Sequence, residues 1–478
     1  MFRRNPVVWI FLLALVLRLV PVLLTYDLPI GLDDMFQYDM LARSIVAGDG
    51  YRWYAEGDLV HIQRYIRMEK PADYDPRGIP TSFRAPGYPA LLALIYAVVG
   101  VGADRFFAVR LVQAFLGAAL APLSCILARQ VGFSRRGAHW TGIIVATFPL
   151  LIVYPLALVS ENLLIPLLTL ALVLTLRAGR RRRLRDYALL GVVLGLTALT
   201  RSIAAGFVPV AALWSWYTAP QDGAQPQKRA ALRSVALLVL CFLLVTTPWA
   251  VRNTRLHGQL TWIETSLGYN LYIGYHPQSN GTFQYGISLD LLPIMDDAER
   301  DDLGMAAFWR FLHADPGRVP GLMARKAGHL WALDSRALIY FYANGFLGQW
   351  PAWLLGSALL LACGPLMLLA PLAVAGLFCG PLTRPKLLLA GLVAYYIGAH
   401  VLIMAEPRFR LPLLPIVALL AAYALDERPW RESRPWQRGL VILIIALLGV
   451  NWGLELVRNW STLTALFGPD GTHLRLPY

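Results

Sequence analysis

Cysteine and charge are both scarce in this chain of 478 residues, and their scarcity narrows the class of protein. The four cysteines all lie inside apolar blocks, show no metal-ligand spacing and indicate no redox compartment: Cys125, Cys241, Cys363 and Cys379. Charged residues make up 15% of the chain and hydrophobic residues 57%. The apolar residues fall in blocks of about 18 to 25, the length that crosses a bilayer core. The chain is therefore predicted to be a membrane protein with several spans.

Several common catalytic motifs are also missing from the sequence. It contains no P-loop, no G-x-G-x-x-G and no G-x-S-x-G, which argues against nucleotide-driven and serine-hydrolase chemistry. Six histidines show no H-E-x-x-H or other metal spacing and are treated as structural residues or weak acceptor-site candidates: His61, His257, His276, His313, His329 and His400. The net charge of +14 could indicate nucleic acid, but the basic residues cluster in short loops between apolar blocks. Membrane topology explains that clustering, so no nucleic acid partner is expected.

The apolar blocks predict an all-α polytopic membrane protein with about eleven spans. They lie near residues 7–25, 105–128, 139–158, 162–178, 187–202, 203–219, 232–250, 351–379, 386–404, 411–425 and 438–456. The first block has a basic lead, a long apolar core and no small-residue cleavage site after it, which indicates a retained signal anchor. Basic residues, including the run at 177–185, gather in one set of short loops. The positive-inside rule then predicts a cytoplasmic N-terminus and two long outer loops, residues 26–104 and 251–350.

Both outer loops are predicted to contain helices at the membrane surface. Residues 34–47 have apolar side chains at helical spacing and are followed by two glycines that end the helix. Residues 87–100 are too short to span comfortably, so they are predicted to form an interfacial or re-entrant helix. The second outer loop has Gly-, Tyr- and Asn-rich turns at 268–286, followed by an amphipathic helix near 296–314.

Acidic residues stand at the outer ends of two apolar blocks. Asp33 and Asp34 follow the first span, where a carboxylate next to low dielectric can act as a general base with a raised pKa or bind a cation. Equally, they can cap the helix at 34–47 and favour its dipole. Glu161 is the one acid in a long apolar stretch, and a charge at a span centre costs about 2.5 to 3.5 kcal/mol, so it is placed at the outer turn. There it is either an active-site carboxylate or a cap with Ser160.

Five arginines map to the same outer edge, against the bias that keeps positive charge inside. They are Arg84, Arg201, Arg252, Arg408 and Arg410. Several guanidinium groups at one depth can hold a phosphate or a diphosphate by bidentate contacts. The alternative is that each side chain snorkels to lipid headgroups, which explains one arginine more easily than five. Acids and arginines at one membrane edge favour a lipid-borne phosphate ester as the substrate.

Six segments carry a resemblance to a known family. They are "DDMFQYDMLARSIVAGDGY", "SFRAPGYPALLALIYAVVG", "SENLLIPLLTLAL", "LTALTRS", "PWAVRNTRLHGQLTWIETSLGYNLYIGYHPQSNG" and "EPRFRLPLLPIVALLAA", in this order within roughly residues 5–425. Each is a weak signal alone, but the ordered set is fairly specific. It resembles bacterial glycosyltransferases with the C-type membrane fold (GT-C), in the superfamily of the dolichyl-phosphate-mannose protein mannosyltransferases and the lipid A aminoarabinose transferase.

That resemblance implies an inverting transfer of a hexose or pentose from a polyprenyl-phosphate donor to an acceptor hydroxyl or phosphate on the outer face. The family's first-loop aspartate maps to Asp34, four residues before Tyr38, and its second-loop carboxylate maps to Glu161. The common D-E pair is Asp34-Met35 here, so Asp33 can share or replace a role. The phosphate-holding residues of the family map to Arg84 and Arg201 and then to Arg252 and Arg408, and the neighbouring Arg410 is grouped with them. The expected substrate-lining residues are Tyr38, Tyr88, Asn253, Tyr269 and Asn270.

The resemblance also sets the expected partners and cofactors. No cofactor is required; a divalent cation at Asp34 and Glu161 is left open, because two carboxylates without a histidine form at best a hard-cation site. The expected partners are the donor lipid, a lipid, glycan or protein acceptor and the lipids of a bacterial inner membrane.

Residues 1–425 are predicted to form the catalytic module, and 426–478 the last span with an outer tail. An insertion at 56–80 can shape an acceptor site. Two rival classes are a transporter of lipid-linked sugars and a non-catalytic scaffold. A transporter predicts polar or broken spans at mid-membrane, whereas the polar residues here gather at the outer edge.

Overall fold

The computed structural model describes residues 5–218, 225–343, 345 and 348–474. In these residues eight helices are long and apolar enough to cross a membrane, and a bent pair can make a ninth. The long helices are α1 (Pro6–Leu24), α5 (Arg105–Val131), α8 (Glu161–Arg181), α11 (Gln225–His257), α17 (Ala352–Phe378), α18 (Arg384–Leu402), α19 (Leu414–Glu427) with the 3₁₀ turn η3 (Pro407–Leu413) before it, and α20 (Pro435–Arg458). A multi-pass, all-α membrane architecture is thus confirmed. Arg3 and Arg4, which begin the predicted cytoplasmic end, lie outside the described residues.

Two of the eleven predicted spans form helices that are shorter than the others. The block at 187–202 forms α9 (Leu184–Thr200), which has 17 residues, and the block at 203–219 forms a short unit of η2 (Ser202–Gly206) and α10 (Phe207–Tyr217). The two are separated because Arg201 adopts an extended conformation, with φ −151° and ψ 122°. This interruption shortens both helices below the length of the other spans.

The block at 139–158 is also interrupted. It forms α6 (Arg135–Thr147), α7 (Pro149–Val153) and the turn η1 (Tyr154–Leu156), with a bend of 57° between the two halves. Pro149 lacks the backbone N–H that a continuing helix needs, so the ladder stops there. The break therefore follows directly from the sequence.

Arg18 of α1 supports this bend from inside the bundle. Its side chain is fully buried and donates hydrogen bonds to Ala146 O and Val145 O, both at 3.0 Å, as well as to Ala14 O of its own helix. The last carbonyls of a helix lack intrahelical partners, and here a guanidinium supplies them. Gly117 on α5 leaves room, since a Cβ there would lie 2.9 Å from Arg18 Nε.

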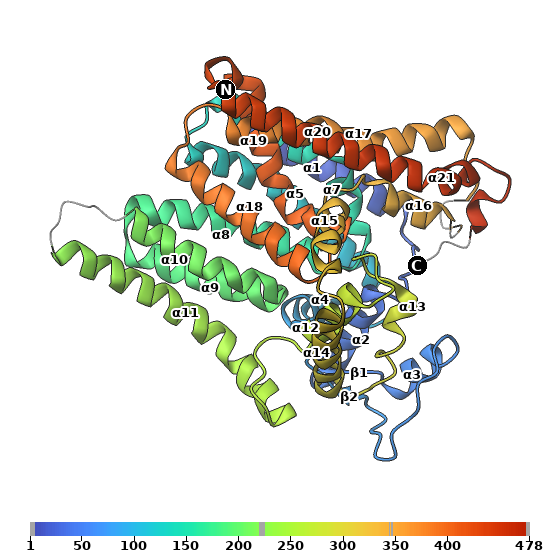
Figure 1. The fold of residues 1–478 in the computed structure, drawn as a ribbon. Coiled ribbons are helices and arrows are strands. Elements are labelled where there is room, and N and C mark those ends of the chain that lie inside the picture. Colours follow the sequence, from blue (N-terminus) through green and yellow to red (C-terminus); the bar gives the residue numbers. More distant parts are fainter. Residues whose placement is uncertain (1–4, 219–224, 344, 346–347, 475–478) are drawn as a thin grey trace.

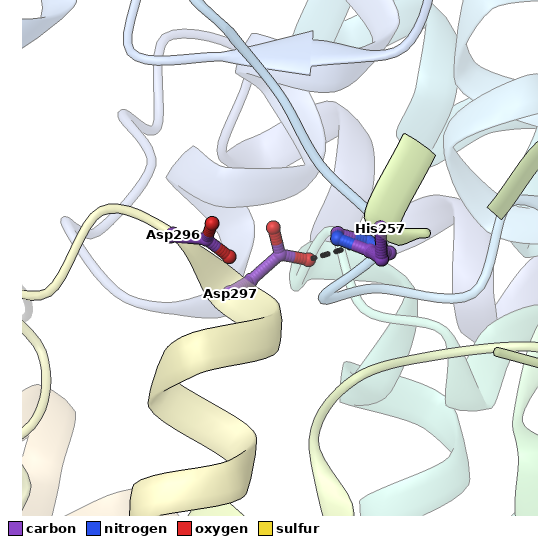
Figure 2. Close-up of side chains that lie close together, drawn as sticks. All are labelled: His257, Asp296 and Asp297. Atoms are coloured by element: carbon purple, nitrogen blue, oxygen red, sulfur yellow. Dashed lines mark ion pairs between the residues drawn. The ribbon is translucent and has the colours of Figure 1, made fainter. Parts of the chain in front are cut away.

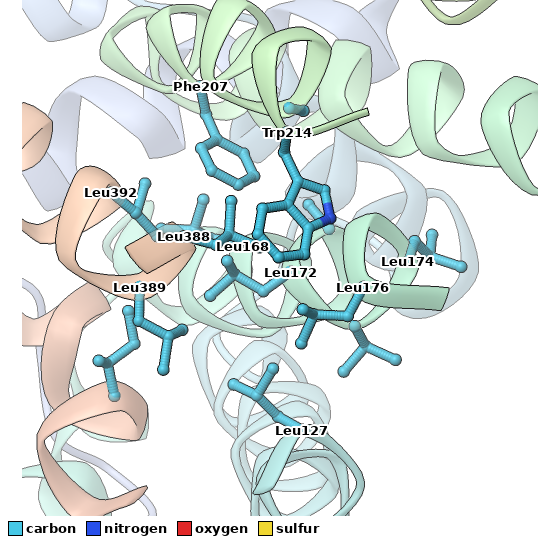
Figure 3. Close-up of a cluster of buried hydrophobic side chains, with 14 of the residues drawn as sticks. Leu127, Leu168, Leu172, Leu174, Leu176, Phe207, Trp214, Leu388, Leu389 and Leu392 are labelled. Atoms are coloured by element: carbon cyan, nitrogen blue, oxygen red, sulfur yellow. The ribbon is translucent and has the colours of Figure 1, made fainter. Parts of the chain in front are cut away.

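The largest buried cluster fixes how α8 and α9 lie. Figure 3 shows part of it: Leu127 from α5, Leu168, Leu172, Leu174 and Leu176 from α8, Phe207 and Trp214 from α10, and Leu388, Leu389 and Leu392 from α18. α8 and α9 pack as antiparallel neighbours, and α9 also packs along α11. The first residue of α8, Glu161, and the residue after α9, Arg201, consequently meet at one end of the bundle.

The two long loops contain the remaining elements. The first long loop, residues 26–104, holds α2 (Asp34–Ala47), β1 (Arg52–Trp53), α3 (Glu56–Ile62), β2 (Ile79–Pro80) and α4 (Gly87–Val99). The second long loop, residues 251–350, holds α12 (Leu267–Tyr275), α13 (Tyr285–Ser288), α14 (Asp297–Ala314), α15 (Arg318–Leu330) and α16 (Ser335–Ala343). The predicted helices at 34–47, 87–100 and 296–314 are confirmed as α2, α4 and α14. In Figure 1, α2, α12, α13 and α14 gather beside the two short strands, which pair antiparallel.

The end of the chain returns to the bundle. The turn η4 (Pro429–Glu432) leads into α20, which packs along α17 (Figure 1). Beyond it lie α21 (Trp460–Leu466) and the turn η5 (Gly471–His473), and both contact α16 of the second long loop.

Candidate functional site

Two carboxylates and three guanidinium groups from distant parts of the chain form one cluster. Asp34 accepts from Arg84 through Oδ1, and its Oδ2 lies 2.9 Å from Nη1 of Arg408. Glu161 Oε1 lies 2.6 Å from Nη1 of Arg201. The negative charges of Asp34 and Glu161 both act on Arg408, so the two ion-paired groups share one electrostatic environment. We call these five residues the charge cluster.

The start of α2 separates the roles of the two neighbouring aspartates. Asp33 is the N-cap residue, and its Oδ1 accepts from the backbone N–H of Met35 at 2.9 Å. Asp34, the first residue of the helix, turns its carboxylate to the arginines instead. The sequence left capping and chemistry open for both residues; the structure gives the cap to Asp33.

The same surroundings move the two aspartate pKa values in opposite directions. Burial raises the pKa of Asp34, but Arg84, Arg408 and Arg201 outweigh burial and hold that pKa well below its usual range. Burial also raises the pKa of Asp33, and the negative charge of Asp34 raises it further. Asp34 is therefore held ionised while its neighbour is easier to protonate.

Glu161 is buried at the first position of α8, with 3% of its side chain exposed. Ser160 is the N-cap residue but makes no side-chain capping bond; its Oγ lies 3.4 Å from Glu161 Oε2. The capping alternative for this pair is thus not what the structure shows. The guanidinium of Arg201 lies over the ring of Phe409 at 4.9 Å, which fixes its plane beside Glu161.

Arg84 is fixed by contacts within the first long loop. Its Nε donates to Gln37 Oε1 at 2.8 Å, and its guanidinium lies 5.1 Å from the ring centre of Phe83 and 5.6 Å from that of Tyr38. Gln37 was not singled out from the sequence, although it lies one helical turn after Asp34 on α2.

Arg252 and Arg410 do not join the charge cluster. Arg252 donates to Thr81 O at 2.6 Å and to Tyr51 O at 3.2 Å, which ties α11 to the first long loop. Arg410 is fully buried, pairs with Asp334 and donates to Leu330 O at 2.9 Å. Their contacts join segments of the fold, so the phosphate-binding role expected of them remains a prediction that the geometry does not favour.

The predicted substrate-lining residues divide in a similar way. Tyr38 faces Arg84 and packs edge-on against Tyr88, with 4.9 Å between ring centres. Tyr88 is fully buried and donates to Gln113 Oε1 at 2.6 Å. Asn253 is buried and donates to Trp262 O and Ile263 O. Tyr269 packs against Phe83, whereas Asn270 of α12 is partly exposed. Of the five, Tyr38 lies nearest to the charge cluster.

Glu264 is a carboxylate near this region that sequence reasoning missed. It is partly exposed and accepts a hydrogen bond from Ser202 Oγ, next to Arg201 in the chain. Burial lowers the pKa of Arg84, but Asp34, Tyr38 and Glu264 outweigh burial and raise it. The stretch "TWIETSLGYN" carries no local pattern that marks this glutamate.

One group of residues has the composition of a metal site. Figure 2 shows His257 facing Asp297, with Asp296 beside it, and potential ligand atoms of the three lie within 4.8 Å of one another. Asp296, however, accepts from the backbone N–H groups of Ala298 and Glu299 as the N-cap of α14. Asp297 Oδ2 already accepts four hydrogen bonds from neighbouring residues. These contacts describe a structural junction rather than a cation site.

The charge cluster does not fit a cation either. Both oxygens of Asp34 face guanidinium groups, and Glu161 faces a third. A divalent ion placed between them would be repelled by three positive charges at close range. The arrangement suits an anion that competes with the carboxylates for the arginines.

Comparisons with known proteins agree with this architecture. Residues 83–252 match the family model described as dolichyl-phosphate-mannose-protein mannosyltransferase. An oligosaccharyltransferase of Archaeoglobus fulgidus, solved with Zn and sulfate, is 16% identical, with a TM-score of 0.51, over 99% of this chain and 57% of that one. The oligosaccharyltransferase AglB from Archaeoglobus fulgidus, solved with an inhibitory peptide and a dolichol-phosphate, is 13% identical, with a TM-score of 0.50, over 99% of this chain and 61% of that one.

A third structure, ArnT from Cupriavidus metallidurans bound to undecaprenyl phosphate, is 16% identical, with a TM-score of 0.47, over 96% of this chain and 65% of that one. No curated protein matches the sequence. The chain spans about three fifths of the length of the solved structures that it resembles. It has the GT-C fold seen in these membrane glycosyltransferases, and its residues 83–252 match the family model described as dolichyl-phosphate-mannose-protein mannosyltransferase.

Proposed function

We propose that this chain is a membrane glycosyltransferase that moves a sugar from a polyprenyl-phosphate-linked donor to a lipid, glycan or protein acceptor. The observation that carries the proposal is the position of Asp34 between Arg84 and Arg408. The family description of residues 83–252 names a lipid-phosphate sugar, and the archaeal structure with a TM-score of 0.50 holds a dolichol-phosphate. Both support a lipid-linked donor.

Donor binding is a competition for the arginines. A phosphate and a carboxylate offer guanidinium groups the same kind of oxygen acceptor, and phosphate accepts bidentate contacts equally well. Arg84 and Arg408 are 23% and 37% exposed, so a headgroup can reach them. A donor phosphate that takes these contacts leaves Asp34 without its strongest cationic partners.

This exchange gives Asp34 its chemistry. Its pKa is low while the arginines face it, and it rises when a phosphate neutralises them, which makes the carboxylate a better proton acceptor. The acceptor oxygen then attacks the anomeric carbon, its proton passes to Asp34, and the bond from that carbon to the phosphate oxygen breaks with its electron pair. Arg84, Arg408 and Arg201 stabilise the charge left on the lipid phosphate. A single displacement of this kind inverts the anomeric centre.

We place this reaction at the outer face of a bacterial inner membrane, with the N-terminus in the cytoplasm and no required cofactor. The support is the charge bias of the short loops, including the basic run at 177–185, and the side on which the charge cluster then falls. We retain residues 1–425 as the catalytic module.

The test compares Asp34→Asn with Asp33→Asn in membranes supplied with polyprenyl-phosphate sugars that carry a labelled sugar. Asn caps helices as well as Asp, so Asp33→Asn should keep the fold and most of the activity. Asp34→Asn should lower label transfer by roughly 100-fold or more while donor binding persists. Equal transfer by both variants would refute the base assignment. Donor that crosses the bilayer intact would instead show the transporter activity that the sequence alone left open.

A further inference from the structure

The backbone just before Arg84 is held by a helix from the second long loop. Asp297, the first residue of α14, is buried, with 1% of its surface exposed. Its Oδ2 accepts from Ser82 N at 2.7 Å, Ser82 Oγ at 3.1 Å and Thr81 Oγ1 at 3.2 Å. Thr265 Oγ1 donates to the same oxygen at 2.6 Å. More than two hundred residues separate Asp297 from Thr81 and Ser82.

Arg300, one turn further along α14, holds the next residue of the same segment. Its guanidinium lies 4.4 Å from the ring centre of Phe83 and 5.3 Å from that of Trp53. Nη1 donates to Ile294 O at 2.9 Å, whereas Nε and Nη2 find no hydrogen-bond partner among the residues that the structure describes, although the side chain is fully buried. These two rings, with the ring of Tyr269 at 5.8 Å, are therefore the main partners of this cation.

Arg84 follows this segment directly, so its position depends on it. The carbonyl of Arg84 accepts from Tyr51 OH at 2.8 Å, and its Nε donates to Gln37. Bidentate recognition of a phosphate is sensitive to displacements of about 1 Å, because reacting groups must meet within a narrow range of distance. A release of the backbone at Ser82 and Phe83 would remove one of the constraints that set the position of the Arg84 guanidinium.

Two other functions for this junction fail on its contacts. A metal would have to displace four hydrogen bonds from Asp297 Oδ2. A serine nucleophile would need Ser82 and Asp297 on opposite nitrogens of His257, but Ser82 Oγ at 2.7 Å and Asp297 Oδ2 at 3.9 Å both face Nε2. The contacts serve the segment that leads to Arg84.

We infer that Asp297 is a positioning residue that places the Arg84 guanidinium for the donor phosphate. This inference rests on the proposed function, because the donor phosphate is the ligand that Arg84 would meet. In this inference, a residue of the second long loop sets the position of a phosphate-binding side chain in the first long loop.

The experiment measures KM for the donor, KM for the acceptor and kcat in Asp297→Asn, with Asp296→Asn as the matched control. Asp296 lies next to Asp297 but only caps α14, and Asn preserves a cap. We expect the donor KM to rise about tenfold in Asp297→Asn, equivalent to about 1.4 kcal/mol, with the acceptor KM unchanged and kcat within about twofold. Asp296→Asn should match the unmodified protein. An unchanged donor KM in folded Asp297→Asn overturns the inference.

A double-variant cycle separates positioning from a general structural role. In an Arg84→Ala background, Asp297→Asn should raise the donor KM by less than about twofold, because no guanidinium remains to be placed. The same tenfold rise in both backgrounds would show that Asp297 acts on the fold as a whole and would refute the inference. If Asp297→Asn does not fold, Ser82→Ala tests the same contact, since it removes only the hydroxyl; we expect about a threefold rise in donor KM that also vanishes without Arg84.

Failure of the proposed function gives a different result. The unmodified protein would then transfer no sugar, and binding of polyprenyl phosphate itself, measured on the unmodified, Asp297→Asn and Arg84→Ala proteins, would still test the placement of Arg84. Weaker binding in both variants supports the inference, and equal binding in all three refutes it.

Discussion

Two sets of arginines in this molecule have different partners. Arg18 and Arg110 lie in α1 and α5, are fully buried and donate to backbone carbonyls; Arg110 contacts Leu156 O at 2.9 Å and Leu28 O at 2.7 Å. Arg84 lies in the first long loop and Arg408 in the turn η3 at the start of a span; both keep part of their surface exposed and face the carboxylate of Asp34. Both sets carry the same charge in an apolar chain.

The difference teaches what makes an arginine ready for a ligand. A backbone carbonyl at a helix break or loop cannot leave, so a guanidinium that satisfies it is committed to the fold. A carboxylate can yield its place to a phosphate without breaking the backbone. Exposure together with a carboxylate partner marks the arginines that can bind an anion.

Arg410 tests whether both conditions are needed, because it has a carboxylate partner, Asp334, but is buried. We predict that Arg410→Met lowers the free energy of unfolding by about 3 to 5 kcal/mol, since it leaves Asp334 charged and buried. The double variant Arg410→Met, Asp334→Leu should recover most of that loss. Denaturant titrations of the purified variants provide the measurement. A large rise in donor KM in the double variant would restore Arg410 to the phosphate site and break the comparison.

Arg110 should contribute to stability and not to donor binding. Arg110→Met would leave the carbonyls of Leu28, Pro29 and Leu156 without these donors, and we expect a loss of about 3 kcal/mol in the free energy of unfolding. The donor KM of the remaining folded protein should stay unchanged. Thermal unfolding combined with donor titration checks both parts, and an altered donor KM would contradict the assignment.

Arg84 should show the opposite behaviour. Arg84→Lys keeps the charge but loses the planar fork that matches a phosphate, so we expect the donor KM to rise about tenfold with little change in thermal stability. A drop in stability without a change in donor KM would place Arg84 with the committed arginines.

Lys326 gives the most gradual effect, because its contribution is spread over several pH units. Burial, aided by Arg318, lowers the pKa of Lys326 from 10.5 to about 7. Between these pH values the unfolded chain binds a proton that the folded chain does not, so stability rises with pH by up to about 1.4 kcal/mol per unit. Lys326→Met should remove this rise, as seen by comparing thermal midpoints at pH 7 and pH 9. An unchanged slope would show that other groups cause it.

The fold and the membrane side shared by the site residues could be predicted from the sequence. Which carboxylate pairs with which guanidinium within the charge cluster could not. Short basic loops and apolar blocks placed Asp34, Glu161, Arg84, Arg201 and Arg408 on one side of the membrane, and the structure brings these five together. Which guanidinium meets which carboxylate depends on helix packing, such as the antiparallel contact of α8 and α9. No local pattern encodes that choice.

Other contacts could not be foreseen for the same reason. Arg252 and Arg410 look like Arg84 in sequence, yet partners in the two long loops, Thr81 and Asp334, occupy their guanidinium groups. The contact of Asp297 with Ser82 joins segments 215 residues apart. The shortness of the helices on either side of Arg201 and the bend at Pro149 were not predicted, because an extended residue and a proline interrupt runs that are apolar in composition.

The shortness of α9 has a consequence for the lipid around it. Its 17 residues rise about 26 Å, some ångströms less than the roughly 30 Å of a hydrocarbon core. A bilayer accommodates a short span by thinning locally. Arg201 follows the end of this helix directly, so a bilayer that thins at this end brings lipid headgroups to the depth of its guanidinium. A long-chain phosphate could then reach the charge cluster by lateral diffusion, with its tail still among the acyl chains.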